Sequence, residues 1–358
     1  MSLPCFKSDN QRKMRRSVLF SAALAALAEQ ASAEVWGRSL YNETTANHTC
    51  QLHISKSIPS TNLGSKYATE EPILSCSAGA QASLVDTCCT ETFGGLVMAT
   101  QLWNVYTGLE SQGQVLPKGA WTLHGLWPDF CNGSYTQYCD LGRQYDPDPS
   151  PNTTTGTASG TPVPPYAGPD IGTFLEPFEK YDLLAYMQRY WVSRGQANAG
   201  FWAHEFSKHA TCYSTFDVPC YGPKYVEHED VVDFFETAVA FYRGLPSWDW
   251  LAGAGITPSN STTYTLSDIQ SVLTEAFGAV PYIACSGKRY NATEAGAGSS
   301  DNGYTQLSEI WYYHHVYGRP QDHDAVPVAA NSTGGSLGNC ASTPGAIYYY
   351  ERASGSEV

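Results

Sequence analysis

The chain has 358 residues, with 34 Asp or Glu against 20 Lys or Arg, and its formal net charge at pH 7 is −14. A surface this acidic repels polyanions at neutral pH and argues against a tight nucleic-acid binder, but it leaves room for an enzyme that holds one or two nucleotides in a local pocket. Protonation of the nine His and of carboxylates reduces the repulsion, so any activity on a polyanion is expected to improve in acid.

Residues 1–33 are predicted to be an N-terminal extension and signal peptide. Residues 12–16 are basic, residues 17–28 form an apolar run, and Ala31-Ser32-Ala33 is a small-residue cleavage pattern. The run is too short to span a bilayer, and no later segment is long and apolar enough. We therefore expect a secreted protein or one of the vacuolar or lysosomal lumen, with no membrane association after cleavage. Met14 is an alternative start to Met1.

Residues 34–358 are expected to form a single domain. Removal of residues 1–33, which hold five Lys or Arg and two Asp or Glu, leaves a net charge of −17. Seven Asn-x-Ser/Thr sequons agree with passage through a glycosylating pathway. The candidate glycosylation sites are Asn42, Asn47, Asn132, Asn152, Asn260, Asn291 and Asn331.

Ten cysteines follow residue 33, an even number that predicts a disulfide framework in a secreted chain. They are Cys50, Cys76, Cys88, Cys89, Cys131, Cys139, Cys212, Cys220, Cys285 and Cys340. No pair of Cys-x-x-Cys motifs occurs, which disfavours a structural metal site. Spacing alone leaves the pairing open.

The first strands are predicted at 95–103 and 121–124. In the second, Thr122 and His124 would share one face, and Gly125 then permits a turn that presents Trp127 and Asp129 nearby. A lone His on a strand is more often structural than catalytic. An indole ring beside a carboxylate, however, can read a nucleobase. The alternative is core packing for Trp127 and a turn cap for Asp129.

The later elements mix helices and strands without βαβ alternation. Helical spacing is found at 174–194, 229–243 and 266–277, whereas 282–285, 309–317 and 347–351 are predicted to be strands. Residues 146–166 and 291–303 are predicted to be exposed low-complexity loops. The pattern predicts an α+β fold in which helices pack on a central antiparallel sheet.

Residues 201–212, Phe-Trp-Ala-His-Glu-Phe-Ser-Lys-His-Ala-Thr-Cys, carry the densest chemistry of the chain. No Pro or Gly interrupts the run, so a helix is predicted. On a helix His204 and Lys208 sit four residues apart, as do Glu205 and His209, and the four side chains form one patch. Two imidazoles, a carboxylate and an ammonium suit proton transfer and the stabilisation of an anionic transition state.

Two other interpretations of this patch remain. Charged patches are often the solvated, salt-bridged face of a helix. A zinc site is the second, because His-Glu begins the His-Glu-x-x-His signature. Here the next His follows five residues after the first rather than four, which rotates it off the first ligand's face.

The segment 121–129, Trp-Thr-Leu-His-Gly-Leu-Trp-Pro-Asp, and the segment 201–212 together resemble the two active-site signatures of the ribonuclease T2 family. The resemblance runs from about Cys50 to about Glu351 and is closest to fungal-type members with five disulfides. It implies a metal-independent acid endoribonuclease without cofactor. Such enzymes cleave single-stranded RNA to 2′,3′-cyclic phosphates, then more slowly to 3′-phosphates, with low base specificity.

The resemblance also implies a role for each matched residue. His209 matches the general base that takes the 2′-hydroxyl proton, and His124 matches the general acid that protonates the leaving 5′-oxygen. His204 matches the phosphate-binding His. Glu205 and Lys208 match the pair that stabilises the pentacovalent intermediate.

The residues of this chain that match the family's primary base pocket are Trp127, Asp129, Tyr135 and Phe201. By the same resemblance the disulfides would be Cys50–Cys89, Cys76–Cys131, Cys88–Cys220, Cys139–Cys212 and Cys285–Cys340. The 2′-hydroxyl is the nucleophile, so DNA is not expected to react, and a monomer is expected.

The departures from the family pattern are modest. Ala210 stands where the family often has Gly, Phe206 replaces a frequent Trp, and the 101–103 region differs in spacing, which leaves the second base site open. No matched catalytic position is lost, so an active enzyme is expected. The alternatives are a secreted interaction protein on the same scaffold, suggested by the acidic surface and the long loops, and a zinc hydrolase.

Overall fold

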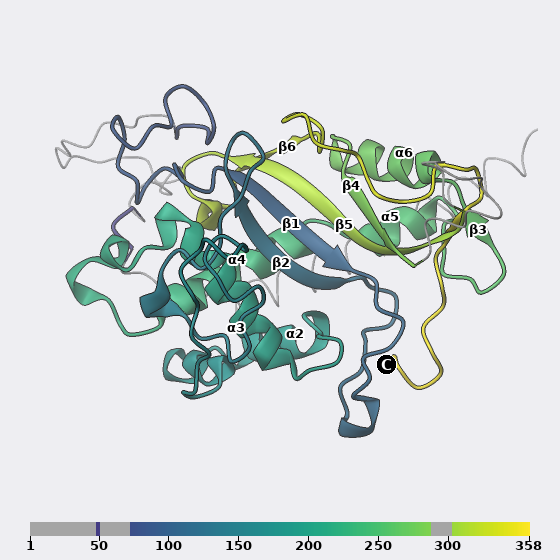
Figure 1. Cartoon of the computed structure of the whole chain (residues 1–358), viewed down its shortest axis with the longest axis horizontal. Helices are drawn as coiled ribbons and strands as arrows, with labels where there is room; N and C mark the ends of the chain where they lie inside the picture. Colours follow the sequence, from purple (N-terminus) through teal and green to yellow (C-terminus); the bar gives the residue numbers. More distant parts are fainter. Residues whose placement is uncertain (1–47, 51–71, 288–302) are drawn as a thin grey trace, which may run out of the picture. The chain divides into compact units, whose positions relative to one another are not determined.

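The computed structural model describes residues 48–50, 72–287 and 303–358 (Figure 1). The predicted signal peptide at 1–33, with its alternative start Met14, lies outside the described residues, as do Asn42, Asn47, Asn291 and nearly all of the predicted 291–303 loop. Within the described ranges, none of the helices combines the length and apolar character needed to cross a bilayer.

The described residues form one sheet of seven strands. In chain order these are β1 (Leu96–Leu102), β2 (Thr122–Asp129), β3 (Thr263–Tyr264), β4 (Tyr282–Ser286), β5 (Thr305–Val316), β6 (Ala325–Val328) and β7 (Ile347–Tyr348). The strand order is β2-β1-β5-β7-β3, and β4 and β6 also pair with β5. All pairs are antiparallel except β5 with β7.

Helices pack on this sheet, as the α+β prediction requires. The α-helices are α2 (Tyr181–Tyr190), α3 (Asn198–Lys208), α4 (Glu229–Arg243), α5 (Ser247–Gly253) and α6 (Leu266–Phe277). Short 3-10 turns are η2 (Glu110–Gln112), η3 (Leu141–Arg143), η4 (Ile171–Phe178), η5 (Ala210–Cys212), η6 (Ser214–Phe216), η7 (Val218–Lys224) and η8 (Pro320–Asp322). Helix α4 packs against β1 and β2, α3 against β2, and α5 against α6 (Figure 1).

Helices α4 and α6 have the bounds that their sequences predict. In α4, Glu229 and Asp230 in the first turn and Arg243 in the last turn complement the helix dipole. Helix α6 ends at Gly278, which has a φ of 96° and adopts the left-handed conformation that terminates helices. Local signals therefore mark both ends of α4 and the C-terminal end of α6.

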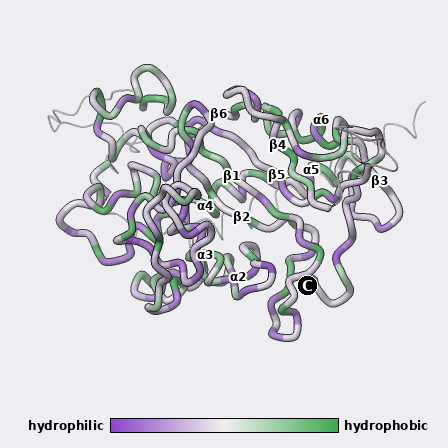
Figure 2. The backbone as a smooth tube through the Cα atoms, viewed as in Figure 1, coloured by the Kyte–Doolittle hydropathy of each residue, from purple (hydrophilic) through white to green (hydrophobic). Residues whose placement is uncertain are grey.

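Strand β1 lies between β2 and β5 and is buried along almost its whole length, as its hydrophobic residues 96–99 require; Figure 2 colours the strands by hydropathy. Its register with β2 shifts midway: Thr100 pairs with Gly125, whereas Gln101 pairs with Leu123. His124 is therefore an extra residue of β2 at a β-bulge, which bends a strand and re-aims a side chain. The predicted turn at Gly125 is wrong, since β2 continues through it to Asp129.

Other differences have local causes. The predicted helix at 174–194 is divided into η4 and α2, because Pro177 lies inside η4 and Glu179 has a left-handed φ of 56°. The predicted 201–212 helix ends at Lys208, after which η5 is a separate 3-10 turn. Strand β5 begins four residues before its predicted start at 309. Strands β3 and β6 have two and four residues, too short for a pattern to mark them.

The 146–166 segment contains no helix or long strand, as predicted, but it is not exposed throughout. Asp146 is 2% exposed and Val163 is 3% exposed. The Gln144 amide donates to the backbone oxygens of Asp146 and Pro164 and so ties together the two ends of the segment. The beginning of this loop is therefore part of the core.

The structure has the five disulfides that the family resemblance implied. They are Cys50–Cys89, Cys76–Cys131, Cys88–Cys220, Cys139–Cys212 and Cys285–Cys340. The described sequon residues Asn132, Asn152, Asn260 and Asn331 are all exposed, so their glycosylation stays a prediction that the fold permits.

Arg143 links the segment before Asp146 to α4. Its guanidinium lies 3.1 Å from Asp230, 2.8 Å from Asp140 and 3.0 Å from Asp217. The carboxylates of Asp140 and Asp217 are about half exposed and contribute little, whereas that of Asp230 is fully buried. The Arg143–Asp230 pair is therefore the strong link.

We expect Arg143→Met to lower the free energy of unfolding by about 3–5 kcal/mol, because it leaves the Asp230 carboxylate buried without its cationic partner. Urea unfolding of the oxidised protein measures the change. The control is Arg189→Met, which removes an exposed Arg from the last turn of α2 and should cost less than about 0.5 kcal/mol. Equal midpoints for the two variants would contradict the assignment.

Candidate active site

The five residues matched to catalysis come together at the contact between β2 and α3. We call them the candidate cluster: His124, His204, Glu205, Lys208 and His209. His124 comes from the bulge of β2, three of the others lie on α3, and His209 caps its C-terminus. Ion-pair, hydrogen-bond and ring contacts join them into one group.

Glu205 lies at the centre of the cluster and is 1% exposed. Its Oε1 lies 3.4 Å from His124 Nε2, and its Oε2 lies 4.0 Å from His209 Nε2. The Trp127 indole donates a 2.7 Å hydrogen bond to Oε2. Two imidazoles from separate elements thus face the two oxygens of one carboxylate.

Gly125 provides the space that this carboxylate occupies. A Cβ atom on Gly125 would lie 2.0 Å from Glu205 Oε2 and 2.5 Å from Trp127 Nε1. Both separations are far below contact distance. The glycine is needed for the close approach of α3 to β2 and not for a turn.

Helical spacing organises the α3 side chains as predicted. Lys208 Nζ lies 3.4 Å from His204 Nε2, one turn earlier, and also donates to the Ser150 backbone oxygen at 3.2 Å. The His209 N–H donates to the Glu205 carbonyl at 3.2 Å, which fixes His209 at the helix end. The side chains of His204 and His209 lie with their ring centroids 6.4 Å apart.

Sequence analysis missed the carboxylate that holds His204. Asp146 Oδ2 lies 2.8 Å from His204 Nδ1 and accepts a 3.0 Å hydrogen bond from the Tyr138 hydroxyl. Asp146 belongs to the segment predicted to be an exposed loop. Its low-complexity surroundings hid it, although an acid next to aromatic and Gln residues was a weak signal.

A second missed carboxylate lies on the other side of His124. Glu309 Oε1 lies 3.6 Å from His124 Nδ1, and the Trp311 indole donates a 2.6 Å hydrogen bond to Glu309 Oε2. Trp311 also meets the Trp127 ring edge-to-face, with centroids 5.4 Å apart. No motif marks Glu309, because only the pairing of β5 with β1 brings it to the site.

The two imidazoles that face Glu205 have opposite electrostatics. Burial acts to lower the pKa of His124, but the Glu205 and Glu309 carboxylates outweigh it and raise that pKa overall. Burial holds the pKa of His209 well below its usual 6.5, and the positive charges of Lys208, His204 and His124 act in the same direction. His209 is thus set to be neutral and His124 to be protonated.

The remaining ionisable groups of the cluster follow the same physics. Burial acts to raise the pKa of Glu205, but His124 and His209 lower it overall, so that it stays a carboxylate. Burial lowers the pKa of Lys208, and the nearby carboxylates of Glu205 and Asp146 oppose this shift.

The residues matched to the base pocket are brought together only in part. The Phe201 ring lies 5.4 Å from the His124 ring, and the Trp127 ring stacks on His209 at 5.0 Å. Burial raises the pKa of Asp129, at the end of β2, to about 7. Tyr135 is 67% exposed, and none of the described hydrogen bonds or ring contacts joins it to the cluster.

The 101–103 region, where the second base site was left open, lies in the core. Gln101 is 1% exposed and donates to the Leu245 carbonyl, and Trp103 is 3% exposed and stacks with Trp248. Neither residue presents a surface to a ligand.

His204, Glu205 and His209 are close enough to raise the question of a metal ion, because one ligand atom of each lies within 4.8 Å of the others. The Lys208 ammonium, however, is 3.4 Å from His204 Nε2. A fixed positive charge there opposes a second cation, and it suits an anion.

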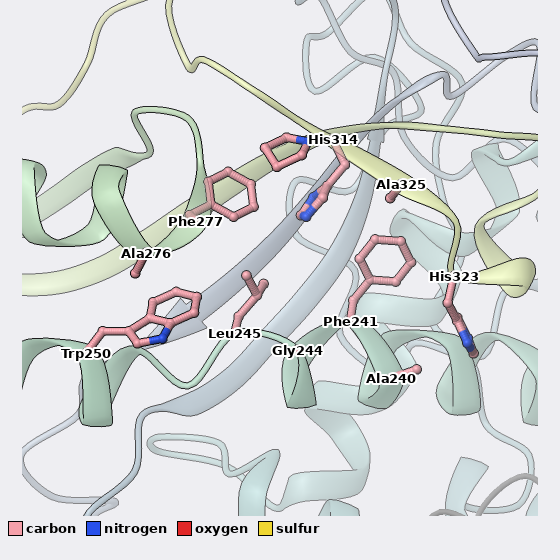
Figure 3. A pocket seen from close by; sticks show the side chains of 11 residues that line it. Ala240, Phe241, Gly244, Leu245, Trp250, Ala276, Phe277, His314, His323 and Ala325 are labelled. Carbon is pink, nitrogen blue, oxygen red and sulfur yellow. The ribbon is translucent and has the colours of Figure 1, made fainter. Parts of the chain in front are cut away.

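A cavity of about 250 Å³ lies elsewhere, between β5 and the helices α4, α5 and α6 (Figure 3). Phe241, Leu245, Trp250, Phe277 and His314 are among its lining residues. Side chains alternate along a strand, so His314 points away from the face of β5 that carries Glu309 and Trp311. The cavity is therefore separate from the candidate cluster.

Comparison with known proteins agrees with the geometry. The model of the Ribonuclease T2 family matches residues 94–326. Ribonuclease Trv of Hypocrea rufa is 35% identical over 264 residues, which are 74% of this chain and 90% of that protein. Ribonuclease T2-like 1-A of Candida albicans is 32% identical over 271 residues, 76% of this chain but only 57% of that longer protein. The crystal structure of Actibind, a T2 ribonuclease, has a TM-score of 0.58 and 31% identity and covers 79% of this chain and 97% of its own.

We expect Gly125→Ala to displace the Glu205 carboxylate, because the new methyl group occupies its position. The pKa of His124 should then fall, and overpacking should lower the free energy of unfolding by about 1–3 kcal/mol. Histidine NMR titration and urea unfolding measure the two effects. Gly253→Ala in α5 is the control: its Cβ meets nothing within 4 Å, and it should leave the His124 titration unchanged. An unshifted His124 in Gly125→Ala would contradict the steric role.

Proposed function

The chain belongs to the ribonuclease T2 family and is an endoribonuclease, and from that premise we propose how it acts and on what. It cleaves single-stranded RNA by transphosphorylation to a 2′,3′-cyclic phosphate, followed by slower hydrolysis to a 3′-phosphate. The observation that carries the proposal is that His124 and His209 face opposite oxygens of Glu205 with unequal pKa values.

In the first step His209 takes the proton of the 2′-hydroxyl, whose oxygen attacks the phosphorus. His124 gives its proton to the leaving 5′-oxygen as that P–O bond breaks. In-line displacement needs a base on one side of the phosphate and an acid on the other, and each such group contributes typically about 10²–10⁴-fold. In the second step the roles reverse: His124 activates a water, and His209 protonates the released 2′-oxygen.

The electrostatics support this division of labour. A general base must start neutral, and burial keeps the pKa of His209 low. A general acid must start protonated, and the Glu205 and Glu309 carboxylates keep the pKa of His124 high. Two histidines can therefore act at the same pH, His209 as the general base and His124 as the general acid.

Lys208 and His204 serve the phosphate. The Lys208 ammonium next to the His204 imidazole offers donors to the non-bridging oxygens, whose negative charge grows in the transition state. Glu205 keeps both proton-transfer groups oriented. Asp146 keeps His204 in place by its Nδ1 side and leaves Nε2 directed toward Lys208.

Base recognition is proposed to be weak. Trp127, which is partly exposed, and Tyr135, which is 67% exposed, offer stacking surfaces, whereas Phe201 is buried against the His124 ring. Stacking tolerates any base and contributes roughly 1–3 kcal/mol per base. Asp129 adds a polar contact, and its raised pKa of about 7 makes it a neutral acid at low pH that can donate as well as accept. DNA is not a substrate, because it lacks the 2′-hydroxyl nucleophile. We also propose that the enzyme is secreted or lumenal and monomeric.

We expect His124→Phe and His209→Phe each to reduce RNA cleavage by at least about 10²-fold while the fold survives. His315→Phe is the control, since His315 lies on β5 outside the cluster and should remain near wild type. Cleavage is measured as the release of the 2′,3′-cyclic phosphate product. EDTA is present to exclude a metal-dependent reaction. Near-wild-type turnover by either variant would reject the assigned roles.

The pH dependence of kcat/KM on a dinucleoside monophosphate should be bell-shaped. The acid limb, where His209 becomes protonated, should lie below pH 6.5, and the alkaline limb, where His124 loses its proton, should lie above it. This substrate has one phosphate, so surface repulsion affects it little. An acid limb at or above pH 6.5 would contradict the division of roles.

A further inference from the structure

We propose that Glu309 is a positioning residue of this reaction, which holds His124 through Nδ1 so that Nε2 is the atom that delivers the proton. The inference rests on the proposed role of His124 as general acid. It assigns a task to a residue of β5, far in sequence from both signature segments.

The geometry places one carboxylate on each nitrogen of the His124 ring. Glu309 Oε1 lies 3.6 Å from Nδ1, and Glu205 Oε1 lies 3.4 Å from Nε2. Of these two sides, only the Nε2 side is shared with His209, which faces the same Glu205 carboxylate. Nδ1 therefore faces Glu309 at an ion-pair distance that is longer than a hydrogen bond, and Nε2 faces the Glu205 carboxylate, on the side of the ring where the rest of the candidate cluster lies.

Glu309 is itself held in place. Trp311, two residues further on the same face of β5, donates its indole N–H to Glu309 Oε2 at 2.6 Å. The Trp311 ring is fixed in turn by stacking on Tyr282 of β4, with centroids 4.5 Å apart. With Oε2 occupied by the indole, Oε1 is the oxygen that faces His124.

Glu309 remains ionised in this environment. Burial acts to raise its pKa, but His124 and the Trp311 N–H lower it overall. The titratable groups that act on His124 are the Glu205 carboxylate of α3, the Glu309 carboxylate of β5 and the His209 imidazole at the end of α3. The Glu205 carboxylate has three partners, namely His124, His209 and Trp127. Among the described residues, the Glu309 carboxylate contacts His124 and Trp311.

The experiment compares Glu309→Gln, Glu309→Asp and Trp311→Phe with the wild type. The first variant removes the charge but keeps the shape, and the second keeps the charge. The third keeps an aromatic ring, smaller than the indole, but removes the N–H that orients Glu309. Glu351→Gln is the control, because it removes an exposed carboxylate outside the cluster. Two quantities are measured: the pKa of His124 by NMR, assigned with His124→Phe, and the alkaline limb of kcat/KM on a dinucleoside monophosphate.

We expect Glu309→Gln to lower both the His124 pKa and the alkaline limb by about 1 pH unit or more. Glu309→Asp should recover part of the shift, and Trp311→Phe should move both quantities in the same direction by less. Glu351→Gln should move neither. If Glu309→Gln does not fold, Trp311→Phe decides, and the absence of any shift in the variant that is tested overturns the proposal.

The two proposals fail in different ways. If His124→Phe retains turnover, the general-acid role fails, whatever Glu309 does. If His124→Phe is inactive but the His124 pKa in Glu309→Gln equals that of the wild type, the positioning role fails and the proposed function stands. A lowered His124 pKa without a shift of the alkaline limb would show that Glu309 does not set the reactive proton, and this also overturns the inference.

Discussion

The carboxylate of Glu205 is 1% exposed, and an ionised group at that depth is stable only with charged or hydrogen-bonded partners. The Trp127 indole and the imidazoles of His124 and His209 supply them. Each partner requires something of the fold: the bulge of β2 turns His124 inward, Gly125 leaves room, and the end of α3 presents His209. The architecture around α3 and β2 thus follows from the need to surround one buried negative charge.

That charge acts unequally on its two imidazole neighbours, and the inequality suits one histidine to the proposed role of acid and the other to that of base. His124 has a second carboxylate and gains enough favourable interaction to outweigh its burial. His209 shares only Glu205, lies beside the Lys208 ammonium and is stacked on the Trp127 ring, so that burial prevails. A symmetrical arrangement of the same residues would leave both rings in the same protonation state, and a concerted proton relay would not start.

How much of this could be predicted depends on how local each signal is. Helices α4 and α6 are set by their own periodicity and end residues, and the α3 patch by helical spacing, so the sequence predicted them. The bulge at His124 arises from a register shift against β1, which no local pattern encodes. Glu309 reaches the site through strand pairing, and Asp146 through a hydrogen bond from Tyr138 within a segment whose composition indicated exposure. The sequence analysis therefore missed the contacts between distant segments that neither a local pattern nor the family resemblance marks.

The acid preference that the family resemblance implies would have a separate origin from the proposed catalytic imidazoles. With the pKa of His209 lowered and that of His124 raised, the two rings are protonated as the proposed roles require on both sides of neutral pH. The net charge of −14, in contrast, repels a long polyanion until carboxylates and exposed imidazoles take up protons. Asp129 would add a local contribution, because burial raises its pKa to about 7 and its carboxyl group, neutral in acid, would not repel an RNA held at the proposed base pocket. Preference for acid should thus grow with the length of the RNA, since the chemistry is local and the repulsion is not.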